Sequence, residues 1–190
     1  MHKLKEITNL KAGSPQFRVK ESQSKNARIY FYYTAESLRY DLYQEDENAD
    51  PIKTKQISTE DKVVEVSEGD LIFSLMSSQA AIAGKSHEGY LLTQNFVKIQ
   101  PDEGISKSYL AYIINEDKVF RKSLDANQQG FIPKITIRDL SESIVRTLPS
   151  IEKQKLIGDT YLKQKRLSYI RSKRMKLEDD YILELLKEGI

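Results

Sequence analysis

The sequence after Pro149 constrains the fold more than any other feature, because no further proline interrupts it before the C-terminus. A proline disfavours helical geometry in the residue before it, so Pro149 ends whatever precedes it. Ser150 can cap a following helix, and Glu152 in the first turn suits the positive end of the helix dipole. The pattern predicts one helix over Ile151–Lys187, about 55 Å long at about 1.5 Å per residue. The rest of the chain is too small to bury such a rod along its whole length.

Apolar residues recur along this predicted helix at spacings of three and four, which is typical of a coiled-coil seam. They are Ile157, Tyr161, Leu167, Ile170, Leu177, Tyr181 and Leu185. Gln164, Arg171 and Arg174 interrupt the seam, and Gly158 costs about 1 kcal/mol relative to alanine. Such a stripe needs a partner helix, and residues 1–149 offer no second helix of that length. We therefore expect dimerisation through the C-terminal helix.

Composition narrows the class of protein. Of the 190 residues, 39% are hydrophobic and 31% are charged, which suits a modest core carrying an extended, solvated element. Lys and Arg (30) nearly balance Asp and Glu (28), so net charge does not indicate a nucleic-acid partner. The absence of cysteine excludes disulfides, thiolate nucleophiles and cysteine-ligated zinc. No apolar run reaches the roughly 18 residues of a membrane span, and the first residues do not form a secretory signal. We expect a soluble, cytoplasmic protein that has no membrane partner.

Residues 1–149 predict an α+β domain in which strands dominate. "ARIYFYYT" is rich in aromatic and β-branched residues, and its consecutive aromatics predict a strand covered on both faces. "DKVVEVSEGDLIFSL" predicts two short strands around a turn at Ser67–Asp70, and "GYLLTQNFVKIQP" a strand that Pro101 stops. "SKSYLAYIINEDKVFRKSL" has helical spacing, with Ser106 or Ser108 as its cap. "KLKEITNLKAG" fits either helix or strand, and "GFIPKITIRDL" predicts a strand or bend.

Several motifs resemble known catalytic or ligand-binding sites but lack a residue that those sites need, or match them only loosely. Gly84-Lys85-Ser86 ends like a phosphate-binding loop, but Gln79 stands where the first glycine is needed. His2 and His87 are predicted to be surface residues. Asp50, Glu60 and Lys62 loosely match the Asp…Glu-x-Lys site of magnesium-dependent nucleases, so a small nuclease is one alternative. A coiled-coil interaction module without DNA is another. We expect no cofactor and no metal site.

Four segments, in order, resemble the specificity (S) subunit of type I restriction–modification systems. "KLKEITNLKAG" resembles the opening of a target recognition domain, "VSEGDLIFSL" its strand pair, and "LTQNFVKIQP" the strand that follows. "NQQGFIPKITIRDLSESIVRTLPSIEKQKLI" resembles the closing signature, with Gln154 and Ile157 at the Q-x-x-I positions after Pro149. The resemblance implies a DNA-reading domain at 1–149, a spacer and dimerisation helix at 150–190, and no catalytic role. It implies methyltransferase and restriction subunits as partners.

Family members of full length carry two recognition domains, whereas this sequence holds one globule and one helix. Two interpretations of the sequence are open: a natural half-subunit, or a piece of a longer protein. In either case the resemblance implies a homodimer through antiparallel helices that reads a bipartite, palindromic site in double-stranded DNA. The residues expected to contact phosphates are Arg18, Lys20, Lys25, Arg28, Lys85 and Lys134. Those expected to reach base edges are Ser77, Gln79, Gln128 and Gln129.

Overall fold

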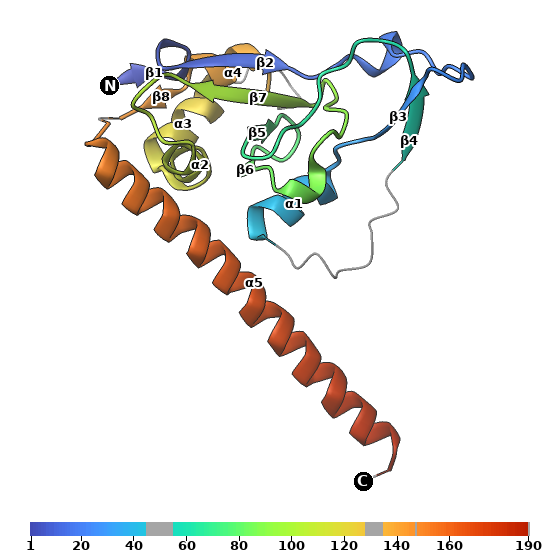
Figure 1. The fold of residues 1–190 in the computed structure, drawn as a ribbon. Coiled ribbons are helices and arrows are strands. Elements are labelled where there is room, and N and C mark those ends of the chain that lie inside the picture. Colours follow the sequence, from blue (N-terminus) through green and yellow to red (C-terminus); the bar gives the residue numbers. More distant parts are fainter. Residues whose placement is uncertain (45–54, 128–134, 147, 190) are drawn as a thin grey trace.

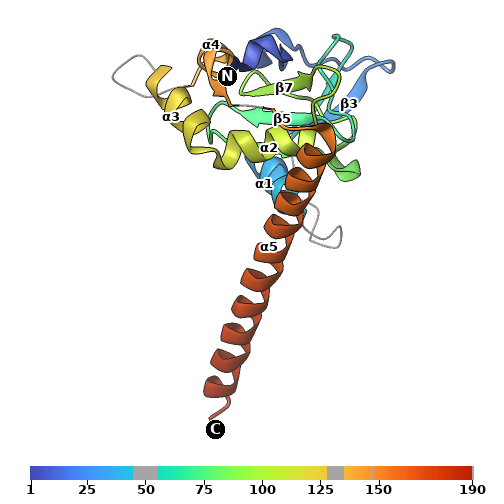
Figure 2. The same ribbon diagram turned by 90° about the vertical axis from the view of Figure 1, so that its left-hand side faces the viewer.

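A computed structural model describes residues 1–44, 55–127, 135–146 and 148–189 of the chain. These residues form a mixed α+β globule from which one long helix projects (Figures 1 and 2). The predicted fold class is thereby confirmed.

The globule is built on a four-stranded antiparallel sheet with the order β2–β7–β5–β6. Its strands are β2 (Thr8–Ala12), β7 (Phe96–Pro101), β5 (Leu71–Ser74) and β6 (Ala80–Ile82). β7 ends at Pro101, as the sequence predicts. The turn before β5 also forms, with Gly69 at a φ of 77°. The residues before that turn make only an isolated bridge between Glu65 and Leu91, so the first of the two strands predicted there is wrong.

The two faces of this sheet carry different helices, because successive residues of a strand point to opposite sides. Leu71 and Phe73 face a core formed with α2 (Lys107–Glu116), α3 (Lys118–Asn127) and α4 (Ile137–Glu142). Ile72 faces a second core formed with α1 (Ala35–Tyr43). The sheet is therefore covered on both sides, which explains why all of β5 is buried.

Local capping signals decide where two of these helices begin. The Ser106 side chain accepts the Tyr109 amide, which confirms Ser106 as the cap of α2. Thr136 and Asp139 form a capping box that starts α4. The strand or bend predicted over this segment is therefore wrong for residues 137–140, because the reciprocal Thr136–Asp139 bonds satisfy the amides that open a helix.

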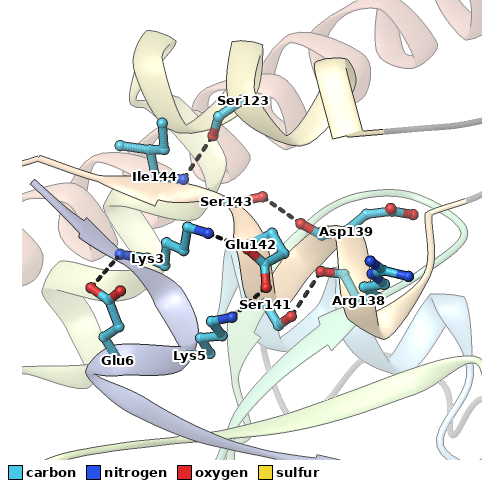
Figure 3. A network of polar contacts seen from close by, with 10 residues as sticks. All are labelled: Lys3, Lys5, Glu6, Ser123, Arg138, Asp139, Ser141, Glu142, Ser143 and Ile144. Atoms are coloured by element: carbon cyan, nitrogen blue, oxygen red, sulfur yellow. Dashed lines mark hydrogen bonds and ion pairs between the residues drawn. The ribbon is translucent and has the colours of Figure 1, made fainter.

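The start of the chain pairs with the end of the globule. "KLKEITNLKAG" divides into β1 (His2–Lys3), the 3₁₀ turn η1 (Leu4–Glu6) and β2. β1 pairs with β8 (Ile144–Val145). The ammonium groups of Lys3 and Lys5 lie 2.6 and 2.5 Å from the Glu142 carboxylate, as Figure 3 shows. The N-terminal strand thus holds the segment that leads into the long helix.

The long helix α5 spans Ile151–Lys187, with the bounds that the sequence predicts. It crosses α2 at Gly158, where an added Cβ would lie 2.3 Å from Ser108 Oγ and 2.4 Å from the Tyr109 amide nitrogen. Gly158 is therefore a point of close backbone approach rather than a simple interruption of the helix.

Polar side chains fix α5 on either side of this crossing. Gln154 is buried; its Nε2 donates to the Pro149 carbonyl (2.9 Å), and its Oε1 accepts the Ser106 amide (3.1 Å). Tyr161 lies one turn past Gly158 on α5. Its Oη accepts a hydrogen bond from Asn115 Nδ2 of α2, which also donates to the Ala80 carbonyl, at 2.8 Å each. The helix is thereby bonded directly to α2, and Asn115 links this contact to the edge strand β6.

Two residues predicted on the partner-facing seam lie instead in the chain's own core. Tyr161 is 7% exposed, and Ile157 packs beside it against the cluster around α2. The reason is geometric: Tyr161 and Ile170 are nine residues apart, which at about 100° per residue places them on opposite sides of the helix. The apolar residues left exposed on the seam side begin at Leu167.

We expect Gly158→Ala to lower the free energy of unfolding by about 1–2 kcal/mol, because the added methyl group forces α5 away from α2. Helix propensity alone would raise stability by about 1 kcal/mol, so the sign separates the two effects. Urea denaturation measures the change, with the exposed Lys163→Ala as control. An unchanged or more stable Gly158→Ala protein contradicts the close crossing.

We expect Glu142 to contribute pH-dependent stability. Hydrogen bonds from Lys3 and Lys5 lower the pKa of Glu142 to about 2. Because the folded pKa is depressed, the contribution is complete above the ordinary glutamate pKa of about 4.3 and is lost as pH falls towards about 2. Glu142→Gln should lower the urea midpoint at neutral pH and have no effect at about pH 2. The exposed Glu68→Gln serves as control, and an equal effect of Glu142→Gln at both pH values would contradict the assignment.

Candidate nucleic-acid interface

A two-stranded antiparallel ribbon lies beside the central sheet (Figure 1). Its strands are β3 (Arg28–Phe31) and β4 (Gln56–Thr59), in which Tyr30 opposes Ile57 and Phe31 opposes Gln56. Tyr30 and Ile57 belong to a small core around Leu91. One face of the ribbon is therefore fixed to the globule.

The opposite face of the ribbon is open to solvent. Ile29 is 59% and Phe31 43% exposed, and they stand across from Ser58 and the exposed Gln56. The prediction that both faces of this strand are covered is wrong for Ile29 and Phe31, which stay exposed although the Phe31 ring lies 5.6 Å from the Tyr90 ring. Tyr32 and Tyr33, which follow β3, are buried as predicted. The outward face thus combines two apolar side chains with an amide and a hydroxyl.

A basic segment runs along the ribbon. It contains the 3₁₀ turn η2 (Gln16–Arg18), and the Ser22 amide donates to the Ser58 carbonyl of β4 at 2.8 Å. Four of the residues expected at phosphates lie on this segment or at the start of β3. They are Arg18, Lys20, Lys25 and Arg28, and all four are exposed.

Contacts within the chain orient part of this basic set. The Arg28 guanidinium lies 4.9 Å from the Tyr30 ring centre and 3.2 Å from Glu65 Oε1. The Lys20 amide donates to Asp61 Oδ2 at 2.7 Å, which leaves its ammonium group at the end of an exposed side chain. Nearby, Phe17 is 77% exposed. The surface therefore offers cations and apolar groups around one protruding ribbon.

Ser77 and Gln79 lie elsewhere, in the turn between β5 and β6. This turn rests on the junction of α2 and α3, where Arg121 donates to the Ser78 carbonyl and Asn115 holds Ala80. Both predicted side chains are exposed, but the structure does not bring them together with the ribbon.

Lys85 is exposed in a third place, the 3₁₀ turn η3 (Lys85–His87). The Asp41 carboxylate holds this turn, since its Oδ1 accepts the Gly84 amide at 3.0 Å and lies 2.8 Å from His87 Nδ1. Asp41 Oδ2 accepts the Tyr33 hydroxyl at 2.7 Å. Burial and the Asp41 charge hold the pKa of Tyr33 well above its usual range.

His87 is 5% exposed, so its prediction as a surface residue is wrong. Its ring packs edge-on against Tyr33, Tyr40 and Tyr90. The sequence holds no local signal for this, because Tyr33, Tyr40 and Asp41 come from the distant segment around α1 and only Tyr90 lies close to η3. The Gly84-Lys85-Ser86 backbone is thus used in a structural turn rather than in a phosphate cradle.

Several predicted residues lie outside the part of the chain that the structure describes: Gln128, Gln129, Lys134 and Asp50. Of the alternative nuclease set, Glu60 and Lys62 are described and exposed. Within the described ranges, no three metal-ligating side chains lie together. The helices of those ranges also include none with the length and apolar character of a membrane span.

Sequence reasoning missed Gln56, Ser58 and Ile29 as candidate contact residues. The available signal was weak: "KQIST" holds the β-branched residues Ile57 and Thr59 among polar ones, as a strand with one solvated face does. The antiparallel pairing of β4 with β3 gives Ile29, Ser58 and Gln56 a common face.

No family model and no curated protein sequence matches the chain. Among solved structures, the chain is similar to the HsdS subunit from Thermoanaerobacter tengcongensis, with 16% identity and a TM-score of 0.52 over 91% of this chain. A chain from a structure concerning complex assembly and conformational transition of the type I R-M system matches 97% of this chain, with 14% identity and a TM-score of 0.60. The S subunit of the type I restriction–modification system from M. genitalium matches 99%, with 16% identity and a TM-score of 0.52.

The fold is thus that of a globule carrying a long C-terminal helix, as in specificity subunits. More particularly, it is the fold of the HsdS subunits of type I restriction–modification systems. The chain spans 38%, 42% and 46% of the length of the three chains that it matches.

Proposed function

We propose that the chain is a sequence-specific DNA recognition subunit of a type I restriction–modification system. The HsdS fold over nearly the whole chain is the observation that carries this proposal. Residues 1–149 act as the target recognition domain, and residues 150–190 act as spacer and dimerisation helix. Catalysis belongs to methyltransferase and restriction subunits that this chain directs to their site in the cytoplasm.

The outward face of the β3–β4 ribbon reads bases in this proposal. The major groove of B-DNA admits a two-stranded ribbon, and glutamine pairs with an adenine edge. Gln56 supplies that amide, while Ile29 and Phe31 supply apolar contacts of the kind that a thymine methyl accepts. The chemistry of this face therefore matches direct readout.

The flanking cations set the register on the duplex. Phosphate contacts position a protein without conveying sequence, and long exposed lysine and arginine side chains suit that role. Lys20, Lys25 and Arg28 occupy the segment beside the ribbon, and the Arg28 guanidinium is stacked on Tyr30.

Two copies of the chain pair through the exposed half of α5. From residue 170 to residue 184 every described side chain is exposed, including Ile170, Leu177 and Tyr181. These three lie on one side of the helix and line a shallow groove of about 410 Å³. An isologous pairing of the two stripes closes a two-fold dimer, so the target is a bipartite palindrome.

Further apolar residues lie off this seam and are available to other subunits. Met175 (64% exposed), Ile182 (53%) and Leu186 (66%) follow one another at spacings of seven and four along a second side of the helix. We assign this second side to the methyltransferase subunits, because a contiguous exposed apolar patch marks a protein contact.

Mapping of methylated sites tests the proposed function. The chain is co-expressed with the methyltransferase subunit of its own system, and the modified adenines or cytosines are located across the host genome. Recognition predicts one bipartite palindromic motif that disappears when this chain is omitted. Methylation that is independent of the chain contradicts the proposal, and nicking of plasmid by the purified chain with Mg²⁺ would favour the nuclease alternative.

We expect Gln56→Ala to relax the specificity at one base position of each half-site and to cost about 1–3 kcal/mol in binding. Lys25→Ala should weaken binding to all DNA sequences alike and reduce the slope of binding affinity against salt concentration by about 1, because it removes a phosphate contact. Binding of the complex to a set of single-base variants measures both effects. Gln79→Ala, in the β5–β6 turn, is the matched control. Loss of a base preference in Gln79→Ala but not in Gln56→Ala would contradict the ribbon as reader.

A further inference from the structure

The part of α5 beyond Tyr161 has two blocks of opposite charge, of which Lys165 and Arg166 contact Glu116 and the Gln44 carbonyl of the same chain. From residue 163 to residue 176 the charged residues are all basic: Lys163, Lys165, Arg166, Arg171, Lys173, Arg174 and Lys176. From residue 178 to residue 188 they are mainly acidic: Glu178, Asp179, Asp180, Glu184 and Glu188, with Lys187. Two such helices attract when they run in opposite directions, since each basic block then faces an acidic one.

We propose that these blocks fix the dimer in one antiparallel register, with its two-fold axis between Met175 and Lys176. This inference rests on the homodimer of the proposed function and deepens it by naming the residues that face each other. In this register Ile170 of one copy packs against Tyr181 of the second, and Arg174 packs against Leu177.

The heptad positions give the flanking pairs. Leu167, Arg174 and Tyr181 occupy the a positions, and Ile170, Leu177 and Glu184 occupy the d positions. Residues at e and g flank the core and set partner choice and orientation. Arg171 then meets Glu178 of the second copy, and Lys173 meets Asp180. Each pair occurs twice by symmetry.

Shifting the helices by one layer in either direction removes this complementarity. If the two-fold axis moves towards the N-terminus, Arg171 faces Arg171 of the second copy and Lys173 faces Lys173. If the axis moves towards the C-terminus, Glu178 faces Glu178 of the second copy and Asp180 faces Asp180. Like charges at these positions are destabilising, so the flanking charges select the central register.

The core position of Arg174 is compatible with this register. Its guanidinium lies 2.8 Å from Glu178 Oε1 of the same helix, so the charge at the seam carries its own partner. Glu178 Oε2 remains to meet Arg171 of the second copy. A polar residue at an a position also specifies register at a cost in stability.

The register defines the span of the dimer. The globules sit on the side of α5 that holds Gly158 and Tyr161, and the seam lies on the opposite side. The two copies of Tyr161 are then about 44 Å apart along the helix direction, at about 1.5 Å per residue. The globule also reaches along α5 on the side away from the seam, where Tyr43 of α1 lies 6.5 Å from the Tyr169 ring and Lys176 lines a cavity with Arg39 and Tyr43.

Charge reversal at one pair tests the register, with sedimentation equilibrium of the full chain without DNA as readout. Lys173→Glu and Asp180→Lys should each raise the dimer dissociation constant about tenfold, because each turns two attractive contacts into repulsive ones. The double variant, Lys173→Glu with Asp180→Lys, should restore wild-type association. An equimolar mixture of the two single variants should form a heterodimer with wild-type affinity.

Lys176→Glu and Asp179→Lys are the matched controls, since they reverse neighbouring charges that point away from the seam and should leave association unchanged. A parallel pair or a shifted register does not bring residues 173 and 180 together, so absence of rescue in the double variant overturns the proposal. A wild-type chain that stays monomeric at micromolar concentration overturns it as well. Neither result affects whether methylation at a specific motif depends on this chain, which tests DNA recognition separately.

Discussion

The close crossing of α5 over α2 at Gly158 determines how the rest of the molecule can act. The Ser108 and Tyr109 backbones occupy the space that any Cβ would need, so the two helix backbones meet directly. On the N-terminal side of this point, Gln154 donates a hydrogen bond to the Pro149 carbonyl. On the C-terminal side, Tyr161 accepts one from Asn115 of α2. A helix held at three successive turns leaves the globule in one direction. The globule and the first half of α5 therefore form one body.

This anchor divides α5 into halves with different chemistry. The first half buries Gln154, Gly158 and Tyr161 and belongs to the domain core. The second half exposes its apolar residues, which an isolated helix in water does not stabilise by itself. A second copy of the helix can bury these apolar residues. Because each helix is rigidly joined to its own globule, the pair then holds two recognition domains at a fixed distance from each other. The ribbon β3–β4 lies on the globule far from the exposed half of α5, so pairing leaves it open to DNA (Figure 1).

Local signals in the sequence predict part of this structure well. The Pro149–Ser150 boundary, the Ser106 cap and the Pro101 stop act through the backbone of neighbouring residues, so the elements that they bound form where expected. Burial that depends on distant partners is not predictable in this way. His87 is buried because Asp41, Tyr33 and Tyr40 from a distant segment surround it together with the neighbouring Tyr90. The open face of β3 follows from the pairing with β4, and the use of Ile157 and Tyr161 within the chain follows from the α2 crossing.

Hydrogen exchange of the backbone amides along α5, measured as a function of protein concentration, tests the central claim most directly. Local opening free energies report which segments share the stability of the core. Residues 151–169 should exchange as slowly as α2 at every concentration, because the same contacts hold both helices. Residues 170–187 should exchange quickly in dilute solution and slow down as the protein becomes concentrated. Fast exchange throughout 151–187 at all concentrations would contradict an anchored helix that is completed by a second copy.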